Sequence, residues 1–419
     1  MGVTTPVRPL YTQAEKNLKS VKPLRFGIDI PYLLVVITLL TAGFIFLYSA
    51  SMPAALWEDQ PLSPSTYVLT QARNALVGAA AAFIVFKIDY RKLQKYMVPM
   101  VLVTLVLLLV VLVFGQFRLG AKRALFDGSI QPSELAKLVV IIYLSYWLNS
   151  KHEVIEKITF GLVPLGVILG LFAGLIALQP DYSAAITVVV LGGILFFLAG
   201  ADLKQILLIV ILAGALGFGV TQTDTGKNRI EKYVPGINEP ENADIHIKRS
   251  IEAIVDGGLF GVGIGKGTVK FTGLPVAQTD SIFAVVTEET GIMGASIIIL
   301  LFIFLLWRGI KIALNAPDLL GKLLAGGISF WIFFEAALNM GVMVNLFPFA
   351  GNTLPFFSLG GSSLVTVLTG VGFVLSVARV SANEKISKEG RTFGAVVNLR
   401  RGDGGRSVSR SRRSSGSRS

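Results

Sequence analysis

The chain has 419 residues but no cysteine, and only two of its residues, His152 and His246, are histidines. The absence of thiols excludes disulfides, thiolate catalysis, iron–sulfur clusters and cysteine–zinc sites. With two imidazoles, neither a histidine-rich metal site nor a Ser-His-Asp triad is expected. Charged residues make up only 15% of the chain against 53% hydrophobic residues, which is not the balance of a soluble protein.

Apolar runs long enough to cross a bilayer fill most of the chain instead. About 20 apolar residues make one helical crossing, so the sequence predicts an all-α, polytopic membrane bundle of about ten transmembrane helices. The predicted ranges are 28–50, 68–88, 96–115, 133–148, 158–178, 184–200, 203–221, 281–307, 322–344 and 361–380. They define a membrane domain at 28–380, after a basic N-terminal segment (1–27) and before a basic, low-complexity tail (381–419) that is expected to be disordered.

The distribution of Lys and Arg predicts the orientation of this bundle. An even number of spans puts both termini on one side, and the positive-inside rule makes that side the cytoplasm. Cations that fall on this side are Lys16, Lys19, Lys22, Arg25, Arg91, Lys92, Lys95, Lys151, Lys157, Arg308, Lys311, Lys322 and those of the tail. Arg118, Lys122 and Arg123 break the rule on the outer side, which calls for an anionic partner there. The tail is expected to be attracted to anionic lipid, and no nucleic-acid partner is expected.

The largest polar stretch between predicted spans is the segment 222–280, expected as an extracytoplasmic loop between the seventh and eighth helices. Turn residues fill its first part, where Pro235 and Gly236 are typical. Apolar residues at helical spacing predict a short amphipathic helix before Gly257 and Gly258. The glycine-rich run at 257–267 lacks the first Gly and the Ser/Thr of a phosphate-binding loop, so it is interpreted as backbone that turns tightly against a substrate or a helix.

This segment ends in Asp280, immediately before the eighth span. An aspartate there is either an ordinary helix cap or a general base at the boundary between water and lipid. Glu288 and Glu289 lie about two turns further into the span. Because buried acids in a membrane are costly, they make either a hydrogen-bonded contact between helices or a support for a site.

Three further motifs each allow a structural and a functional interpretation. Lys122 and Arg123 precede the fourth span, where Glu134 and Lys137 lie on one helix face and can pair; alternatively, the cations bind phosphate oxygens of an anionic lipid. Asp181 lies in QPDYSAA, which is a polar turn or part of a site. The segment 345–365 contains prolines and glycines at membrane depth, so it is a tight turn or a non-helical backbone that lines a cavity.

Seven short motifs occur together, in one order, along the predicted spans. They are SAS (49–51), GAKRAL (120–125), QPSELAKL (131–138), QPDYSAA (179–185), AIVDGGLFGVGIGKG (253–267), LPVAQTDSIFAVVTEETGIMGA (274–295) and LPFFSLGGSSLV (354–365). In this order they resemble the SEDS family (shape, elongation, division and sporulation), of the FtsW/RodA type, from about Arg25 to Val380.

The resemblance implies a peptidoglycan glycosyltransferase of the bacterial cytoplasmic membrane. Such a protein polymerises lipid II, the undecaprenyl-pyrophosphate-linked disaccharide peptide, on the outer face. It works with a class B penicillin-binding transpeptidase and other division or elongation membrane proteins. Asp280 falls on the essential loop aspartate of the family. The other motif positions that carry over are Lys122, Arg123, Ser133, Lys137, Asp181, Ser358, Ser362 and Ser363, with Glu134, Glu288, Gly360 and Gly361 as supporting residues. The basic tail favours the cell-division type.

The chain departs from the family pattern at three places. Gln278 stands where the family commonly has His, which removes any proton relay through that neighbour. Ala124 and Leu125 follow the basic pair where Trp is common, and Leu359 replaces Tyr before the glycine pair. These last changes concern contacts with the sugar rather than the base.

The expected chemistry needs one carboxylate. A single-displacement transfer requires a base for the acceptor sugar's hydroxyl, whereas retaining hydrolysis needs a second carboxylate as nucleophile. Cations, and a divalent ion, would stabilise the departing pyrophosphate, and a chain with oxygen ligands but no Cys favours Mg²⁺ or Mn²⁺ over zinc. Two other functions remain open: a flippase for the lipid-linked precursor, with its site near the bilayer midplane, and a non-catalytic scaffold for a cell-wall synthase.

Overall fold

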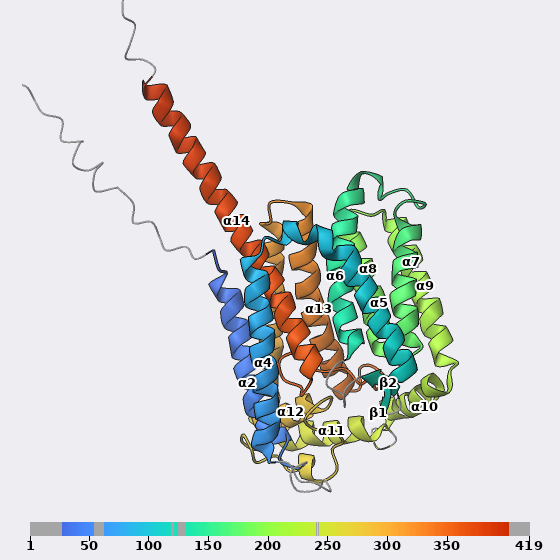
Figure 1. Ribbon diagram of the computed structural model, residues 1–419. Coiled ribbons are helices and arrows are strands. Elements are labelled where there is room, and N and C mark those ends of the chain that lie inside the picture. Colours follow the sequence, from blue (N-terminus) through green and yellow to red (C-terminus); the bar gives the residue numbers. More distant parts are fainter. Residues whose placement is uncertain are drawn as a thin grey trace, which may run out of the picture.

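The computed structural model describes residues 27–53, 63–118, 121–124, 131–239, 241 and 243–401, and it is almost entirely helical (Figure 1). The long helices are α2 (Ile30–Ala50), α4 (Pro64–Lys87), α5 (Met97–Phe114), α6 (Pro132–Lys151), α7 (Leu162–Ala177), α8 (Tyr182–Leu198), α9 (Leu203–Thr221), α12 (Ile282–Leu314), α13 (Leu319–Met343) and α14 (Gly361–Arg401). Between α9 and α12 lie α10 (Asp224–Asn238) and α11 (Ile245–Gly257). Short 3₁₀ turns occur at η1 (Tyr90–Tyr96), η2 (His152–Val154) and η4 (Val269–Phe271).

Every predicted span overlaps one of these helices, which confirms the helical membrane bundle. In the described part of the chain, seven helical segments are long and apolar enough to cross a membrane: α2, α4, η1 with α5, α9, α12, α13 and the first 27 residues of α14. The helices α7 and α8 are apolar but shorter, and α6 carries charged residues in its first and last turns. The count of ten spans, and the side on which the 222–280 segment lies, therefore remain predictions.

The helices α13 and α14 form the centre of the bundle, and α9 lies at its edge. Inside the protein, 72% of the most apolar window of α13 and 78% of that of α14 are buried, against 12% for α9. The described N-terminal end of α2 and the C-terminal part of α14 lie at one end of the bundle, whereas α10, α11, β1 and β2 lie at the opposite end (Figure 1). This arrangement agrees with an even number of crossings.

Three local predictions differ from the structure. An antiparallel hairpin, β1 (Gln116–Arg118) and β2 (Ala121–Ala124), interrupts the expected all-α chain. The segment predicted as turns forms α10, which starts where the Thr223 hydroxyl accepts from Gly226 N at 3.1 Å and tolerates Pro235 only near its end. The expected disorder from residue 381 is wrong as far as Arg401, because α14 continues and Glu384 pairs with Arg91 at 2.7 Å; residues 402–419 lie outside the described residues.

The glycine-rich run packs against a break in α12. At Gly291 the helix opens, with φ 68° and ψ −174°, and a Cβ at this position would lie 2.4 Å from Gly261 N. The freed backbone groups pair with the run: Val262 N donates to Glu288 O at 3.0 Å, and Ile292 N donates to Gly258 O at 2.9 Å. Of the two interpretations of this run, the approach to a helix is the one that these contacts support.

Candidate active site

The four residues that lead into α12 are each fixed by a different hydrogen bond. Gln278 O accepts from Leu359 N at 2.9 Å, and Thr279 O accepts from the Ser358 hydroxyl at 2.6 Å. Asp280 and Ser281 are held by Asn339 of α13 and His246 of α11. Because this segment is anchored to the loop before α14, to α13 and to α11, the half-buried Asp280 is held in one place at the N-terminal end of α12.

The side-chain amide of Asn339 holds Asp280 from α13. It donates to Asp280 O at 2.8 Å and to Asn352 O at 2.6 Å, so one buried amide joins the base segment to the loop after α13. A buried amide with two backbone partners is expensive to remove, because both carbonyls then lose a donor. Asn339 was not predicted, since its partners are distant in sequence.

His246 contacts the same segment from α11. Its Nδ1 lies 3.1 Å from the hydroxyl of Ser281, the N-cap residue of α12, and its ring stacks on Phe349 with centroids 4.1 Å apart. Burial lowers the pKa of His246, while Asp244 acts in the opposite direction and Lys232 adds to the lowering. The neutral imidazole is therefore favoured, and His246 makes a defined contact beside Asp280.

Asp181 is the centre of a second polar cluster, at the start of α8. Its carboxylate accepts from the Ser133 hydroxyl at 3.0 Å and from Gln131 Nε2 at 3.2 Å, and it caps α8 through Ala184 N at 3.4 Å. Asp181 is buried, so these donors replace the water that it loses. The cluster joins the first turn of α6 to the first turn of α8.

The loop between α13 and α14 connects the two clusters. Gln131 N donates to the Ser362 hydroxyl at 3.1 Å, and the hydroxyls of Ser363 and Thr353 lie 3.1 Å apart. The Ser358 hydroxyl also accepts from Leu354 N at 2.7 Å. Gly360 and Gly361 stand where this loop ends and α14 begins, with Leu364 N donating to Gly360 O. Non-helical backbone is thus satisfied by protein groups, as its depth in the bundle requires.

Lys137 lies in a buried triad of charges. It pairs with Glu134 at 2.8 Å, as the spacing predicted, and also with Glu335 on α13, and none of the three side chains is more than 9% exposed. Its ammonium group also lies 5.9 Å from the centre of the Trp331 ring. Two carboxylates already neutralise this cation. Its assignment to substrate binding remains a prediction, and Glu335 could have been suspected as an acid within an apolar span.

Glu288 and Glu289 support the segment between α11 and α12 rather than facing a shared cavity. Glu288 Oε1 accepts from Thr268 N at 2.5 Å and from Val269 N at 3.0 Å. Glu289 Oε1 accepts from Ser49 Oγ at 2.5 Å and pairs with Lys270 at 2.7 Å, where both charged side chains are fully buried. These contacts favour the structural interpretation, in which the two acids fasten this segment to α12 and α2.

The basic pair Lys122 and Arg123 lies on β2, at the same end of the bundle as α11 (Figure 1). Their side chains lie outside the described residues, as does the segment 125–130. A resident metal site is not evident: across the described ranges, no three His, Asp or Glu side chains gather to hold an ion. The predicted Mg²⁺ or Mn²⁺ ion therefore lacks a complete set of protein ligands there, and we assign no reaction step to it.

Comparison with known proteins agrees with this arrangement. The family model for FtsW, RodA and SpoVE cell cycle proteins matches residues 31–383. The chain is 38% identical over 359 residues to stage V sporulation protein E of Bacillus subtilis, covering 83% of this chain and 97% of the relative. It is 36% identical over 368 residues to a protein of Geobacter metallireducens named "Probable peptidoglycan glycosyltransferase FtsW", covering 86% of this chain and 96% of the relative.

Solved structures give the same result at lower identity. A chain from a peptidoglycan synthase complex, studied for how polymerisation and crosslinking are coordinated, superposes with a TM-score of 0.69 at 25% identity, covering 84% of this chain and 98% of that one. The rod shape determining protein RodA of Thermus thermophilus gives 0.63 at 26% identity, covering 85% and 98%. With its motifs, its helical bundle and these matches taken together, the chain belongs to the FtsW, RodA and SpoVE family of cell cycle proteins.

Proposed function

We propose that this protein is a peptidoglycan glycosyltransferase that polymerises lipid II at the outer face of the bacterial cytoplasmic membrane. The observation that carries the proposal is the fixed position of Asp280, whose segment is anchored by Asn339, Ser358, Leu359 and His246 at one end of the bundle. A base must be held still relative to the group that it deprotonates, and four separate anchors supply that condition.

In the proposed reaction, the 4-hydroxyl oxygen of the acceptor sugar forms a bond to the anomeric carbon of the donor. The bond from that carbon to the lipid pyrophosphate breaks, and the pyrophosphate leaves with the electron pair. The hydroxyl proton passes to the Asp280 carboxylate. Lys122 and Arg123, which β2 carries at the same end of the bundle, are proposed to stabilise the negative charge on the leaving group.

The other predicted residues have supporting roles in this proposal. Asp181, Ser362 and Ser363 are proposed to contact the substrate's polar groups, and Ser358 contributes through its bond to Thr279. A Mg²⁺ or Mn²⁺ ion, if used, would arrive bound to the pyrophosphate, because Mg²⁺ is commonly held by one or two carboxylates together with substrate phosphates.

The position of the site favours a polymerase over a flippase. A flippase is expected to have its polar site near the middle of the spans, whereas Asp280 precedes the first residue of α12 and Asp181 precedes that of α8. The proposed partners are a class B penicillin-binding transpeptidase and other division or elongation proteins. A relative named FtsW supports the division type. Both termini are proposed to lie in the cytoplasm, because the Lys and Arg residues are concentrated on that side of the predicted spans.

The test uses purified full-length protein with labelled lipid II, with and without a cognate class B transpeptidase, and glycan strands are resolved on gels. In parallel, the same protein in lipid vesicles is assayed for translocation of a labelled lipid II analogue. The proposal predicts glycan strands without translocation. Translocation without polymer would support a flippase, and neither activity under any partner combination would support a scaffold.

A further inference from the structure

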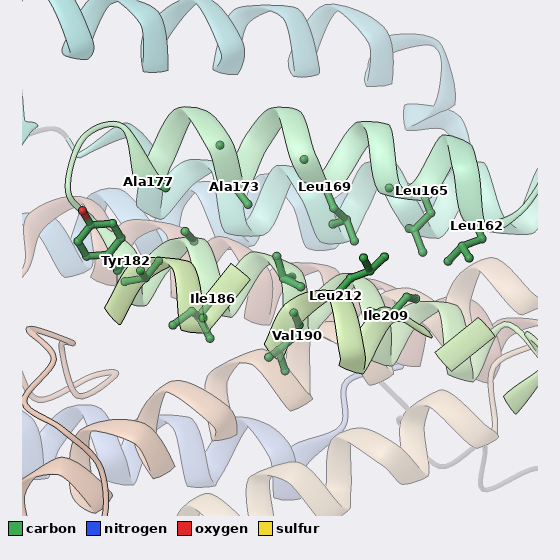
Figure 2. A pocket seen from close by; sticks show the side chains of 18 residues that line it. Leu162, Leu165, Leu169, Ala173, Ala177, Tyr182, Ile186, Val190, Ile209 and Leu212 are labelled. Carbon is green, nitrogen blue, oxygen red and sulfur yellow. The ribbon is translucent and has the colours of Figure 1, made fainter. Parts of the chain in front are cut away.

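An apolar groove of about 350 Å³ runs along the outside of the bundle between α7 and α9, with α8 as its floor (Figure 2). Its walls carry no charged residue, and two lining side chains, Ile186 and Leu212, remain about half exposed. The groove is therefore open toward the surroundings of the bundle. Tyr182 and Ala177 lie at one end of it and Leu162 at the other.

Three glycines on α7 keep this groove open. Gly166, Gly170 and Gly174 are four residues apart, so they lie on one helix face, and a Cβ added at any of them would meet nothing within 4 Å. By contrast, Gly192 on α8 is required by packing, since a Cβ there would lie 2.4 Å from Leu169 Cδ1. Glycine destabilises a helix interior relative to alanine. In the described part of the protein, no neighbouring atom would clash with an added Cβ at the three α7 positions, so packing does not explain these glycines.

The lining of the groove favours an extended apolar occupant. The 16 residues of α7 extend about 24 Å. Apart from the hydroxyl of Tyr182, the residues that line the groove are glycines or have apolar side chains. A linear hydrocarbon chain matches such a surface along its whole length, and a transmembrane helix of a partner is the alternative that the test below distinguishes.

One end of the groove lies beside the polar cluster of the candidate site. Tyr182 lines the groove and directly follows Asp181, whose carboxylate binds Ser133 and Gln131. Tyrosine at such a position is typical of the membrane–water boundary. A molecule whose head group lies outside this end of the groove would therefore have its apolar tail directed along α7, away from the site.

We propose that the α7–α9 groove binds the polyprenyl chain of the lipid-linked substrate and so positions its pyrophosphate at the site. This inference rests on the proposed function. It adds a binding surface formed by residues between Leu162 and Val220, well before Asp280 in the sequence. Among the predicted site residues, only Asp181 lies next to these helices.

The test fills the groove without disturbing the packing. In Gly170→Leu and Gly174→Leu, the new side chain enters open space, so the bundle should fold as before. Gly214→Leu on α9 is the matched control: a Cβ there also meets nothing within 4 Å, but Gly214 does not line the groove. Thermal denaturation of each full-length variant establishes that folding is intact.

Polymerisation is then measured with lipid II that carries either the full undecaprenyl chain or a short farnesyl chain. With the undecaprenyl substrate, the two groove variants are expected to lose roughly tenfold or more in kcat/KM, because buried apolar area is lost. With the farnesyl substrate, their kcat/KM should change little. The Gly214→Leu control should have the kcat/KM of the parent with both substrates. Equal rates for groove variants and parent on the long chain would overturn the inference.

A second measurement is independent of turnover. Lipid II with a photoreactive group near the end of its chain is crosslinked to the Asp280→Asn variant, and the labelled peptides are mapped. Labelling of α7, α8 or α9, abolished by Gly170→Leu, is expected even if Asp280 is not the base. Labelling elsewhere in the bundle, equal displacement by bulk phospholipid, or occupation of the groove by a helix of the transpeptidase would contradict the proposal.

Discussion

The side-chain amide of Asn339 lies 2.8 Å from the backbone carbonyl of Asp280 and 2.6 Å from that of Asn352. A single residue of α13 thereby joins the base segment to the loop before α14. Misplacement of a catalytic group by about 1 Å is enough to slow a reaction about 10²-fold.

We expect Asn339→Ala to lower the polymerisation rate by roughly 10- to 100-fold, since the base segment loses its α13 anchor. Asn315→Ala is the matched control, because Asn315 also donates its amide to a backbone carbonyl, that of Lys311 at 2.8 Å, but is exposed at the other end of α12. Rates are compared at saturating lipid II. An Asn339→Ala protein as active as the Asn315→Ala protein would show that this anchor has no catalytic importance.

The contact between His246 and Ser281 predicts a pH dependence of stability. Burial lowers the pKa of His246, so the unfolded chain, with an ordinary value of about 6.5, binds a proton more readily than the folded protein. Stability is therefore expected to fall as the pH drops through about 6.5, and to continue falling until the folded-state pKa is reached.

The measurement is the melting temperature of parent and His246→Gln between pH 7.5 and pH 5. The parent should lose more stability on acidification than the variant, which has no imidazole to protonate at this position. His152→Gln is the control, since His152 is exposed at the opposite end of the bundle. Identical pH profiles for the parent and His246→Gln would contradict the expectation.

The buried triad of Lys137, Glu134 and Glu335 predicts a large effect on stability. In Lys137→Met, two buried carboxylates lose their common cation, which we expect to cost about 3–5 kcal/mol of the free energy of unfolding. The double variant Lys137→Met/Glu335→Gln should recover part of that loss. Thermal denaturation in detergent measures both.

The same pair of variants separates a structural from a substrate-binding role for Lys137. If Lys137 serves only the fold, the stabilised double variant should regain polymerase activity. If it also binds the substrate, the double variant should be stable but inactive. A single Lys137→Met variant as stable as the parent would contradict the account of the triad.

The absence of cysteine makes the orientation directly testable. Thr272→Cys places one thiol on the exposed segment before Asp280, and Asn315→Cys places one at the exposed opposite end. A membrane-impermeant maleimide should label only Thr272→Cys in intact spheroplasts, and both variants after permeabilisation. The reverse pattern would put Asp280 in the cytosol, where the proposed reaction does not take place.

Local sequence patterns were sufficient to predict the helices, but they could not predict the long-range contacts that hold the site together. The apolar runs predicted helices where the structure has them, because lipid-facing helices need continuous apolar residues. The spacing of Glu134 and Lys137 predicted their ion pair because it depends only on helix geometry. Asn339 and His246 lie 59 and 35 residues from their partners, so no local pattern indicates them.

Local signals also failed where tertiary contacts override them. Pro235 and Gly236 indicated turns, yet α10 forms because Thr223 caps it and the Tyr233 hydroxyl donates to Leu346 O at 2.9 Å. The polar composition after residue 381 indicated disorder, yet Glu384 and Lys385 contact Arg91 and Asn315 and extend α14.

The central claim is that the carboxylate of Asp280 accepts the proton from the acceptor sugar. The most direct measurement is lipid II polymerisation by purified Asp280→Asn, with its partner transpeptidase present and its melting temperature recorded beside that of the parent. We predict an unchanged melting temperature and a loss of at least roughly 100-fold in rate, since general base catalysis contributes about 10²–10⁴-fold. A folded Asp280→Asn protein that polymerises lipid II at the rate of the parent would contradict the account.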